Sequence, residues 1–417
     1  METEIKVING GVCAAKGFKA NGVYCGIKKS ANDDPNAKHK NDLGLIACDV
    51  TCNAAAVYTT NKVKGAPIIV TKSNLTKTGN KAKAVIVNSK NANTCNADGE
   101  AKAEKMCALA AEVLNIKPEE VIVASTGVIG QILPIEPIEE KIGELASGLS
   151  YTGNEEAATA IMTTDTIKKE YAVEFNISGK ICKVGGMAKG SGMIHPNMAT
   201  TLNFITTDVA ISSKMLQKAL DEIVKVTYNC LSIDGDTSTN DMVSLMASGL
   251  ADNEEITADC DEFNKFKDAL YQVMMNLTRM LAKDGEGASK LLECICTECP
   301  TKDDAITVAK SVIGSTLFKC AIFGEDANWG RVLCAIGYAD AEFDINKVDV
   351  SLKSEFGEIK VCENGSGIEF SEEKAAEILK SDEIQVLINL NQGDESATAW
   401  GCDLTYDYVK INGDYRT

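Results

Sequence analysis

Hydrophobic and polar positions along this chain alternate between the two-residue period of strands and the longer period of helices. The apolar run 84–87 predicts a buried strand, and the run 121–124 predicts another that ends in Ser125-Thr126-Gly127. Between these two runs, apolar side chains recur at helical spacing from about Asp98 and predict a helix through Ala103, Met106, Cys107, Ala110, Val113 and Leu114.

The same patterns predict elements over the rest of the chain. Residues 1–7 alternate like a first strand, 171–177 and 180–184 form a hairpin turned at Ser178-Gly179, and 201–206 form a strand. Helices begin at Pro137 and Asn154 and span 212–228 and 260–282; strands lie near Leu291 and Lys319 and over 384–390, and the run 400–411 alternates. Together these elements predict an α/β (α+β) fold of stacked mixed β-sheets flanked by helices.

Composition and charge exclude several classes of protein. Of 417 residues, 45% are hydrophobic and 24% are charged, as in an ordinary soluble enzyme. No uninterrupted apolar run approaches the ~20 residues of a membrane span, and the chain start lacks the basic and apolar regions of a signal peptide, so we expect a cytoplasmic protein. The net charge of −18 comes from residues 200–417, and such acidity argues against binding to a nucleic-acid backbone.

Sixteen cysteines raise the question of a metal site or a disulfide scaffold. The tightest cluster is Cys294, Cys296 and Cys299, and the next cysteine, Cys320, is too distant to complete a zinc or iron–sulfur site. We therefore expect free thiols that pack as small apolar groups, with no metal. The chain also has no Walker-type loop and no G-x-G-x-x-G motif, so no nucleotide cofactor is expected.

The run 234–241 resembles the start of a calcium loop. Such a loop needs glycine at its sixth position and glutamate at its twelfth, where this chain has Thr239 and Leu245. We expect instead a turn rich in hydroxyls and carboxylates close to an active site.

Thr200 is the candidate nucleophile. It follows Ala199 at the end of a turn that contains glycines and Pro196, before a predicted strand. A threonine hydroxyl needs a base beside it, and a cut just before Thr200 would free an α-amine for that task, with a reference pKa of about 7.7–8.0. The chain has only two histidines, His39 and His195, so an amine base is the more economical one. A strand entered through a tight turn explains the same pattern without chemistry.

Two further segments are candidates for the same site. Thr126-Gly127 at a strand end could form an oxyanion hole, since glycine lets its backbone N–H approach a reacting carbonyl and the hydroxyl can also donate. Glu286 lies between two glycines and could project into a cleft to pair with an ammonium group. The alternatives are an ordinary turn at Thr126 and a helix cap followed by a solvated Glu286.

These segments, in this order, carry a resemblance to a known family. The matching blocks cover essentially the whole chain: 10–12, 17–20, 26–29, 60–63, 125–130, 161–165, 189–200, 234–241, 283–287 and 406–417. With them, the chain resembles the ornithine acetyltransferases, the glutamate N-acetyltransferases of arginine biosynthesis, whose fold has amino-terminal-nucleophile character.

The resemblance implies a set of roles. It implies self-cleavage between Ala199 and Thr200 into an α chain, 1–199, and a β chain, 200–417, with Thr200 as nucleophile and Thr126 and Gly127 as the oxyanion hole. The substrate contacts that it implies are Thr163, Lys189, Thr200, Glu286, Asn412 and Thr417. The expected reaction moves an acetyl group from N-acetylornithine to glutamate through an acetyl-threonine ester, without a cofactor, in an α2β2 assembly with no nucleic-acid or membrane partner.

Two alternatives remain at the level of the sequence. An amidohydrolase or aminopeptidase with the same nucleophile would send water to the acyl-enzyme, and a cysteine-rich metal or redox protein would not use Thr200 at all. Whether acetyl-CoA also serves as acetyl donor is left open.

Overall fold

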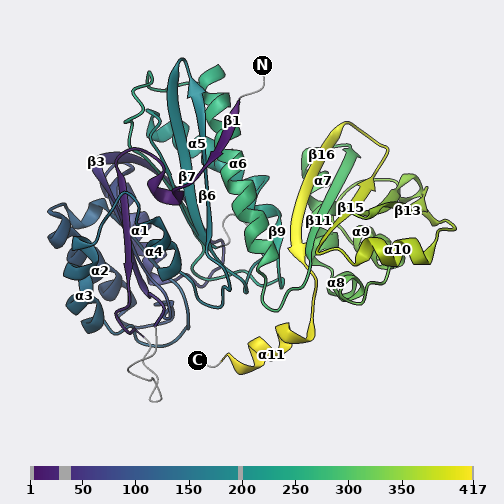
Figure 1. The fold of residues 1–417 in the computed structure, drawn as a ribbon, viewed down its shortest axis with the longest axis horizontal. Helices are drawn as coiled ribbons and strands as arrows, with labels where there is room; N and C mark the ends of the chain where they lie inside the picture. The colour runs from purple at the N-terminus through teal and green to yellow at the C-terminus, as the bar shows by residue number, and fades with distance from the viewer. Residues whose placement is uncertain (1–3, 28–38, 196–200, 416–417) are drawn as a thin grey trace.

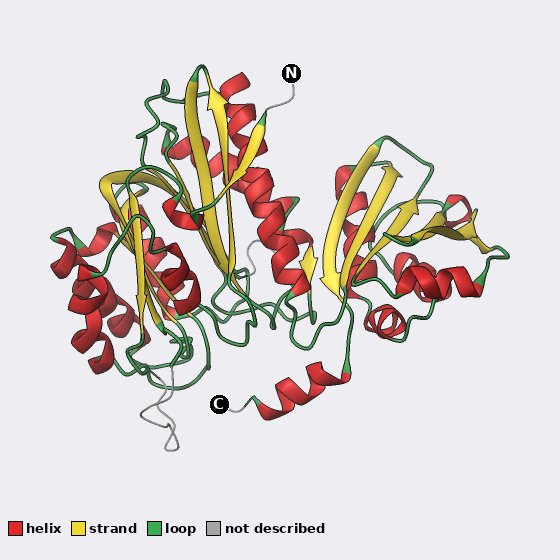
Figure 2. Ribbon diagram, viewed as in Figure 1, coloured by secondary structure: helices red, strands yellow, loops and turns green. Residues whose placement is uncertain are grey.

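The computed structural model describes residues 4–27, 39–195 and 201–415, which form two mixed β-sheets with helices packed on them (Figures 1 and 2). The predicted fold class is therefore confirmed. Ala199, Thr200 and Thr417 lie outside the described residues.

The first sheet has the strand order β1-β6-β7-β8-β10-β3-β4-β5, with β2 paired to β3. Its strands are β1 Ile5–Ile8, β2 Phe18–Val23, β3 Leu43–Tyr58, β4 Lys81–Asn88, β5 Val121–Ser125, β6 Lys169–Ile177, β7 Lys180–Lys189, β8 Leu202–Thr207 and β10 Met242–Ala247. Strand β8 is antiparallel to β7 and parallel to β10. The boundary expected between residues 199 and 200 thus falls inside one sheet, between β7 and β8.

The second sheet is built from residues beyond 230 and has the order β14-β13-β12-β15-β11-β16-β9. Its strands are β9 Leu231–Ser232, β11 Leu291–Cys299, β12 Asp349–Ser354, β13 Gly357–Glu363, β14 Ser366–Gly367, β15 Glu383–Asn389 and β16 Glu395–Cys402. Strand β11 pairs parallel with β15 and antiparallel with β16.

Helices cover both sheets. They are α1 Ala66–Lys77, α2 Gly99–Leu114, α3 Glu136–Ser147, α4 Asn154–Ala160, α5 Ser213–Lys225, α6 Asp261–Lys283, α7 Lys302–Gly314, α8 Thr316–Phe323, α9 Trp329–Gly337, α10 Glu372–Leu379 and α11 Tyr406–Asp414. Short 3-10 turns are η1 Gly11–Cys13, η2 Pro118–Glu120, η3 Tyr228–Cys230 and η4 Ile345–Lys347.

Helix α6 lies between the two sheets and contacts β6 and β7 on one side and β11 and β16 on the other (Figure 1). Its apolar side chains recur at helical spacing and are fully buried, among them Phe263, Phe266, Leu270, Val273 and Leu277. Burial of each such side chain contributes about 1.5–3 kcal/mol relative to exposure. The predicted helix 260–282 is thus the element that joins the two sheets.

Most predicted elements are confirmed. The hairpin of β6 and β7 turns at Ser178 and Gly179, which both have positive φ, as a two-residue hairpin turn of this type requires. The strands at 84–87, 121–124, 201–206 and 384–390 correspond to β4, β5, β8 and β15, and the predicted helices correspond to α2, α3, α4, α5 and α6.

Two predictions are wrong. The strand expected near Lys319 is helix α8, which starts where the Ser315 hydroxyl accepts the backbone N–H of Phe318 at 3.3 Å. The alternating run 400–411 continues as a strand only to Cys402 and then forms helix α11, capped by Thr405, whose hydroxyl accepts the N–H of Asp407. In both segments a side-chain hydroxyl caps the first helical turn and so stabilises a helix rather than a strand.

Twelve of the sixteen cysteines are buried, and all sixteen are free thiols. Cys294, Cys296 and Cys299 are fully buried in β11 and pack as small apolar groups, whereas Cys95, Cys260, Cys320 and Cys334 are exposed. None of the described helices alone has the length and apolar character of a membrane span, whereas the bent pair α7 and α8 has both when the two helices are taken together.

Candidate active site

A cavity of about 130 Å³ brings together six residues that the sequence nominated for function. These are Thr126, Gly127, Thr163, Lys189, Glu286 and Asn412. The rest of its wall is Ala92, Ile129, Thr164, Gly192, Met193, Ser238, Thr239, Asn240 and Tyr415. Residues from five distant parts of the chain thus share one small space. The nominated Thr200 and Thr417 are outside the described residues.

Thr126 and Gly127 follow β5 in a tightly held turn. The backbone N–H of Thr126 donates to the carbonyl of Asn88 at 3.0 Å. Gly127 has a φ of 131°, and a Cβ there would lie 2.2 Å from the carbonyl carbon of Lys90. Only glycine fits this position. The Asn240 amide also holds the turn, because it donates to the carbonyl of Ser125 at 2.9 Å.

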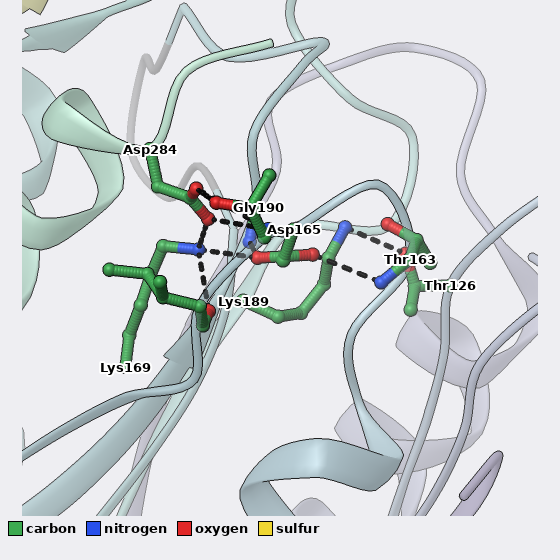
Figure 3. Close-up of polar contacts among 9 residues, drawn as sticks. Thr126, Thr163, Asp165, Lys169, Lys189, Gly190 and Asp284 are labelled. Carbon is green, nitrogen blue, oxygen red and sulfur yellow. Dashed lines mark hydrogen bonds and ion pairs between the residues drawn. The ribbon is translucent and has the colours of Figure 1, made fainter. Parts of the chain in front are cut away.

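Lys189 ends β7 and points its ammonium group at Thr126. The Nζ donates to the Thr126 Oγ1 at 3.3 Å (Figure 3). Burial lowers the pKa of Lys189 below its ordinary value, and the nearby carboxylate of Asp165 acts in the opposite direction. The cation is therefore held at the cavity wall, partly removed from water.

Asp165 is a buried carboxylate that fixes three neighbours at once. Its Oδ1 accepts the Gly190 N–H at 2.7 Å and the Lys169 ammonium at 2.6 Å, and its Oδ2 accepts the Thr163 N–H at 3.0 Å. Burial raises the pKa of Asp165, but the charges of Lys189 and Lys169 outweigh it and hold the pKa below its ordinary value. Asp165 is therefore an anion that sets the positions of Thr163 and of the end of β7.

Lys169 completes this arrangement from the start of β6. Its side chain is fully buried, and its ammonium also pairs with Asp284 at 2.6 Å. Asp284 in turn accepts the backbone N–H of Thr166 at 3.1 Å. Figure 3 shows Lys169 between the two carboxylates, with Lys189 and Thr126 beyond Asp165. Three elements, β6, β7 and the end of α6, are thereby joined behind the cavity.

Glu286 projects into the cavity between flanking glycines, as expected. Its backbone N–H donates to the carbonyl of Ser191 at 2.8 Å, and its carboxylate accepts the Asn412 amide at 2.7 Å. A Cβ on Gly192 would lie 2.3 Å from the Glu286 carboxylate, so a larger residue there would force that carboxylate to move. Through Asn412, helix α11 forms one wall of the site.

The turn 234–241 lies beside the cavity, where the sequence predicted it. The Asp234 carboxylate accepts the N–H groups of Met193 at 2.6 Å and Ile194 at 2.9 Å. Asp241 is buried, and its Oδ2 has no hydrogen-bond partner among the described residues. Burial raises the pKa of Asp241 well above its ordinary value.

Comparison with known proteins adds to this geometry. The model of the ArgJ family matches residues 19–417. The chain belongs to the ArgJ family. An arginine biosynthesis bifunctional protein ArgJ from Caldanaerobacter subterraneus is 49% identical over 99% of this chain and 100% of that protein. ArgJ 1 of Clostridium acetobutylicum is 47% identical over 99% of each. A crystal structure of argJ from Bacillus halodurans is 45% identical and aligns with 51% of this chain and 98% of that one, with a TM-score of 0.49.

Several residues at this cavity have no signal in the sequence that indicates a role. Asp165 and Lys169 lie within four residues of each other, but their partner Asp284 is 115 residues from Lys169, and no local pattern links them. Asn240 and Tyr415 belong to segments that the sequence singled out only as blocks. For Glu286, the glycines on either side were the feature of the sequence that indicated a carboxylate projecting into a cleft.

His195 lies apart from these residues. Its Nδ1 is 2.9 Å from the Ser232 hydroxyl, and it lines another hollow, of about 730 Å³, against α7. Burial lowers its pKa below the ordinary value. Within the part of the chain that the structure describes, no group of three or more His, Cys, Asp or Glu side chains is arranged to hold a metal.

Proposed function

We propose that this protein is a self-cleaving glutamate N-acetyltransferase that moves an acetyl group from N-acetylornithine to glutamate. Membership of the ArgJ family, whose relatives carry the name arginine biosynthesis bifunctional protein, supports an acyltransferase of arginine biosynthesis. The observation that carries the proposal is the cavity in which hydroxyl, glycine N–H, ammonium and carboxylate groups meet.

Maturation uses the same groups as the reaction. The Thr200 hydroxyl adds to the Ala199 carbonyl, the amide nitrogen becomes the amine of Thr200, and an ester joins the two residues. Water then hydrolyses this ester and leaves an α chain, 1–199, and a β chain, 200–417. The amine that is released is the base of the mature enzyme.

In the first half-reaction, Thr200 attacks the acetamide carbonyl of N-acetylornithine. Its α-amine accepts the hydroxyl proton and passes it to the leaving nitrogen, so that ornithine departs as an amine and an acetyl-threonine ester remains. The Thr126 hydroxyl and the Gly127 N–H stabilise the negative oxygen of the tetrahedral intermediate. Gly127 suits this task because it lines the cavity and, without a Cβ, can lie against the backbone of Lys90, where no other residue fits.

Recognition of the substrate rests on opposite charges in the cavity wall. Lys189 provides a cation for the α-carboxylate that ornithine and glutamate share, and Glu286 provides an anion for the side-chain ammonium of ornithine. Thr163, Asn412 and Thr417 are the further substrate contacts of this proposal. In the second half-reaction, the amine of glutamate attacks the ester, takes the acetyl group and restores the Thr200 hydroxyl.

A donor and acceptor assay tests the proposal. Purified protein is incubated with N-acetylornithine, with and without glutamate, and ornithine, N-acetylglutamate and acetate are measured. We expect N-acetylglutamate and ornithine in equal amounts, and little acetate. Acetate release that is independent of glutamate would make the protein a hydrolase, and no turnover would reject both activities.

We also propose acetyl-CoA as a second donor and an α2β2 assembly. The word bifunctional in the names of the relatives supports the first proposal. Formation of N-acetylglutamate from acetyl-CoA and glutamate alone tests it, and native mass measurement tests the assembly.

A further inference from the structure

The hydrogen bond between Lys189 and Thr126 has a fixed direction. A lysine ammonium has three donors and no acceptor, so the Thr126 Oγ1 accepts and Lys189 donates, over 3.3 Å. The hydroxyl proton of Thr126 is then free for another acceptor, and no described residue accepts it. Because Thr126 lines the cavity, that proton is available to an oxygen bound there.

Both partners of this bond are held from behind. The residue after Lys189, Gly190, donates its N–H to Asp165, which Lys169 anchors with its fully buried ammonium. Thr126 is held through its backbone N–H and through Asn240, which binds the carbonyl of the preceding residue. The backbone segments that carry the ammonium and the hydroxyl are therefore fixed by buried contacts that do not depend on a substrate.

We propose that Lys189 is a positioning residue of the oxyanion hole: its ammonium holds the Thr126 hydroxyl with the proton turned into the cavity and strengthens that hydroxyl as a donor. This role rests on the proposed function and is distinct from pairing with a substrate carboxylate. A hydroxyl that accepts a bond from a cation becomes polarised, and its own donated bond gains strength. The effect acts where negative charge develops, so it appears in the chemical step.

A double-mutant cycle distinguishes the two roles of Lys189. The variants are Lys189→Met, which keeps the stem, Thr126→Val, which keeps the shape, and the pair of both. We expect Lys189→Met to lower kcat by about tenfold or more, and the double variant to have the kcat of Thr126→Val within about twofold, because the two residues act as one unit. Lys180→Met, exposed on the same strand, is the matched control and keeps the wild-type kcat.

The pH profile of the first half-reaction gives a second measure. Burial lowers the pKa of Lys189, and the titratable groups that face it are Asp165, Lys169, Asp241 and Glu286. Above that pKa the neutral amine can accept a hydrogen bond from the Thr126 hydroxyl, which then no longer directs its proton into the cavity. Single-turnover release of ornithine should therefore decline at alkaline pH in the wild type, while Lys189→Met should show no such decline.

The outcomes separate this inference from the proposed function. A kcat loss in the double variant equal to the product of the two single losses, or a Lys189→Met variant in which only KM rises, would overturn the inference. If a variant cleaves too slowly for kcat to be measured on the mature form, the same cycle is measured on the rate of self-cleavage, which uses the same hydroxyl. A wild-type protein that transfers no acetyl group would reject the proposed function itself.

Discussion

Gly127 lies so close to the backbone of Lys90 that no side chain fits, so the turn that carries the Thr126 hydroxyl and the Gly127 N–H is packed tightly against that backbone. A turn held in this way is preorganised: its donors need no rearrangement when charge develops on a bound carbonyl. The proposed chemistry therefore depends on the absence of a Cβ at Gly127 as much as on the Thr126 hydroxyl beside it.

Thr126→Ala removes one of the two donors. We predict that acetyl transfer slows by about 10²–10³-fold, since loss of one oxyanion donor costs about 2.7–4 kcal/mol in the transition state. Steady-state kcat with N-acetylornithine and glutamate is the measurement. Turnover close to that of the wild type would remove Thr126 from this role.

The buried carboxyl group of Asp241 makes the stability of the protein depend on pH. Burial raises its pKa well above the ordinary value, so the folded protein binds this proton more tightly than the unfolded chain does, and stability is lost as the pH rises above about 4, the unfolded pKa. We predict that Asp241→Asn increases the free energy of unfolding at about pH 8 and changes it little at about pH 4. Urea unfolding at the two pH values checks this, and an equal effect at both would contradict it.

Three secondary-structure elements, β6, β7 and α6, meet around Lys169, the first residue of β6. Its ammonium lies between Asp165 and Asp284 and is fully buried. The two ion pairs of Lys169 therefore form a junction that holds the first sheet, helix α6 and the cavity wall in fixed relative positions.

Lys169→Met removes that junction and leaves two carboxylates without their cation. We predict a loss of about 3–5 kcal/mol in the free energy of unfolding, because breaking a buried ion pair leaves uncompensated charge. The neighbouring Lys168→Met breaks only an exposed pair with Glu155 and should cost about 0–1 kcal/mol. Denaturant unfolding measures the free energy of unfolding of both variants. Equal losses would show that the buried ion pairs of Lys169 contribute no more to stability than the exposed pair of Lys168.

Periodicity predicted the long elements because their burial follows one regular pattern. Helix α6 has a continuous apolar stripe and β4 a continuous apolar run, and both were readable from the sequence. The strand predicted near Lys319 is wrong for a physical reason. The segment is apolar on several sides of helix α8, so its hydrophobic period is weak, and the Ser315 cap stabilises the helix. At α11 the alternation of Leu404, Tyr406 and Tyr408 continued across a capping threonine.

The candidate site divides along similar lines. Thr126, Gly127 and Glu286 could be nominated because glycines beside a polar residue are a local signal. The Asp165–Lys169–Asp284 group could not, because its partners meet only through the packing of α6 against β6 and β7. Residues that act together and are neighbours in the sequence can be recognised from it, whereas the distant contacts that position them cannot.

For the whole molecule, the first sheet spans the expected point of cleavage. Strands β8 and β10, from the second part of the chain, lie between β7 and β3, from the first. Cleavage between residues 199 and 200 would therefore leave the backbone hydrogen bonds of the sheet in place.

We predict that the two chains stay together after cleavage and separate only in denaturant. Size-exclusion chromatography without denaturant should give one species that contains both chains in equal amounts. A free chain of 1–199 or 200–417 under these conditions would be inconsistent with shared strands.

Sequencing of the amino termini of fully active protein shows whether cleavage frees the amine of Thr200. We predict two starts, one at Met1 or shortly after it and one at Thr200, and a Thr200→Ala variant that remains one inactive chain. Active protein with a single start at the beginning of the chain would contradict it.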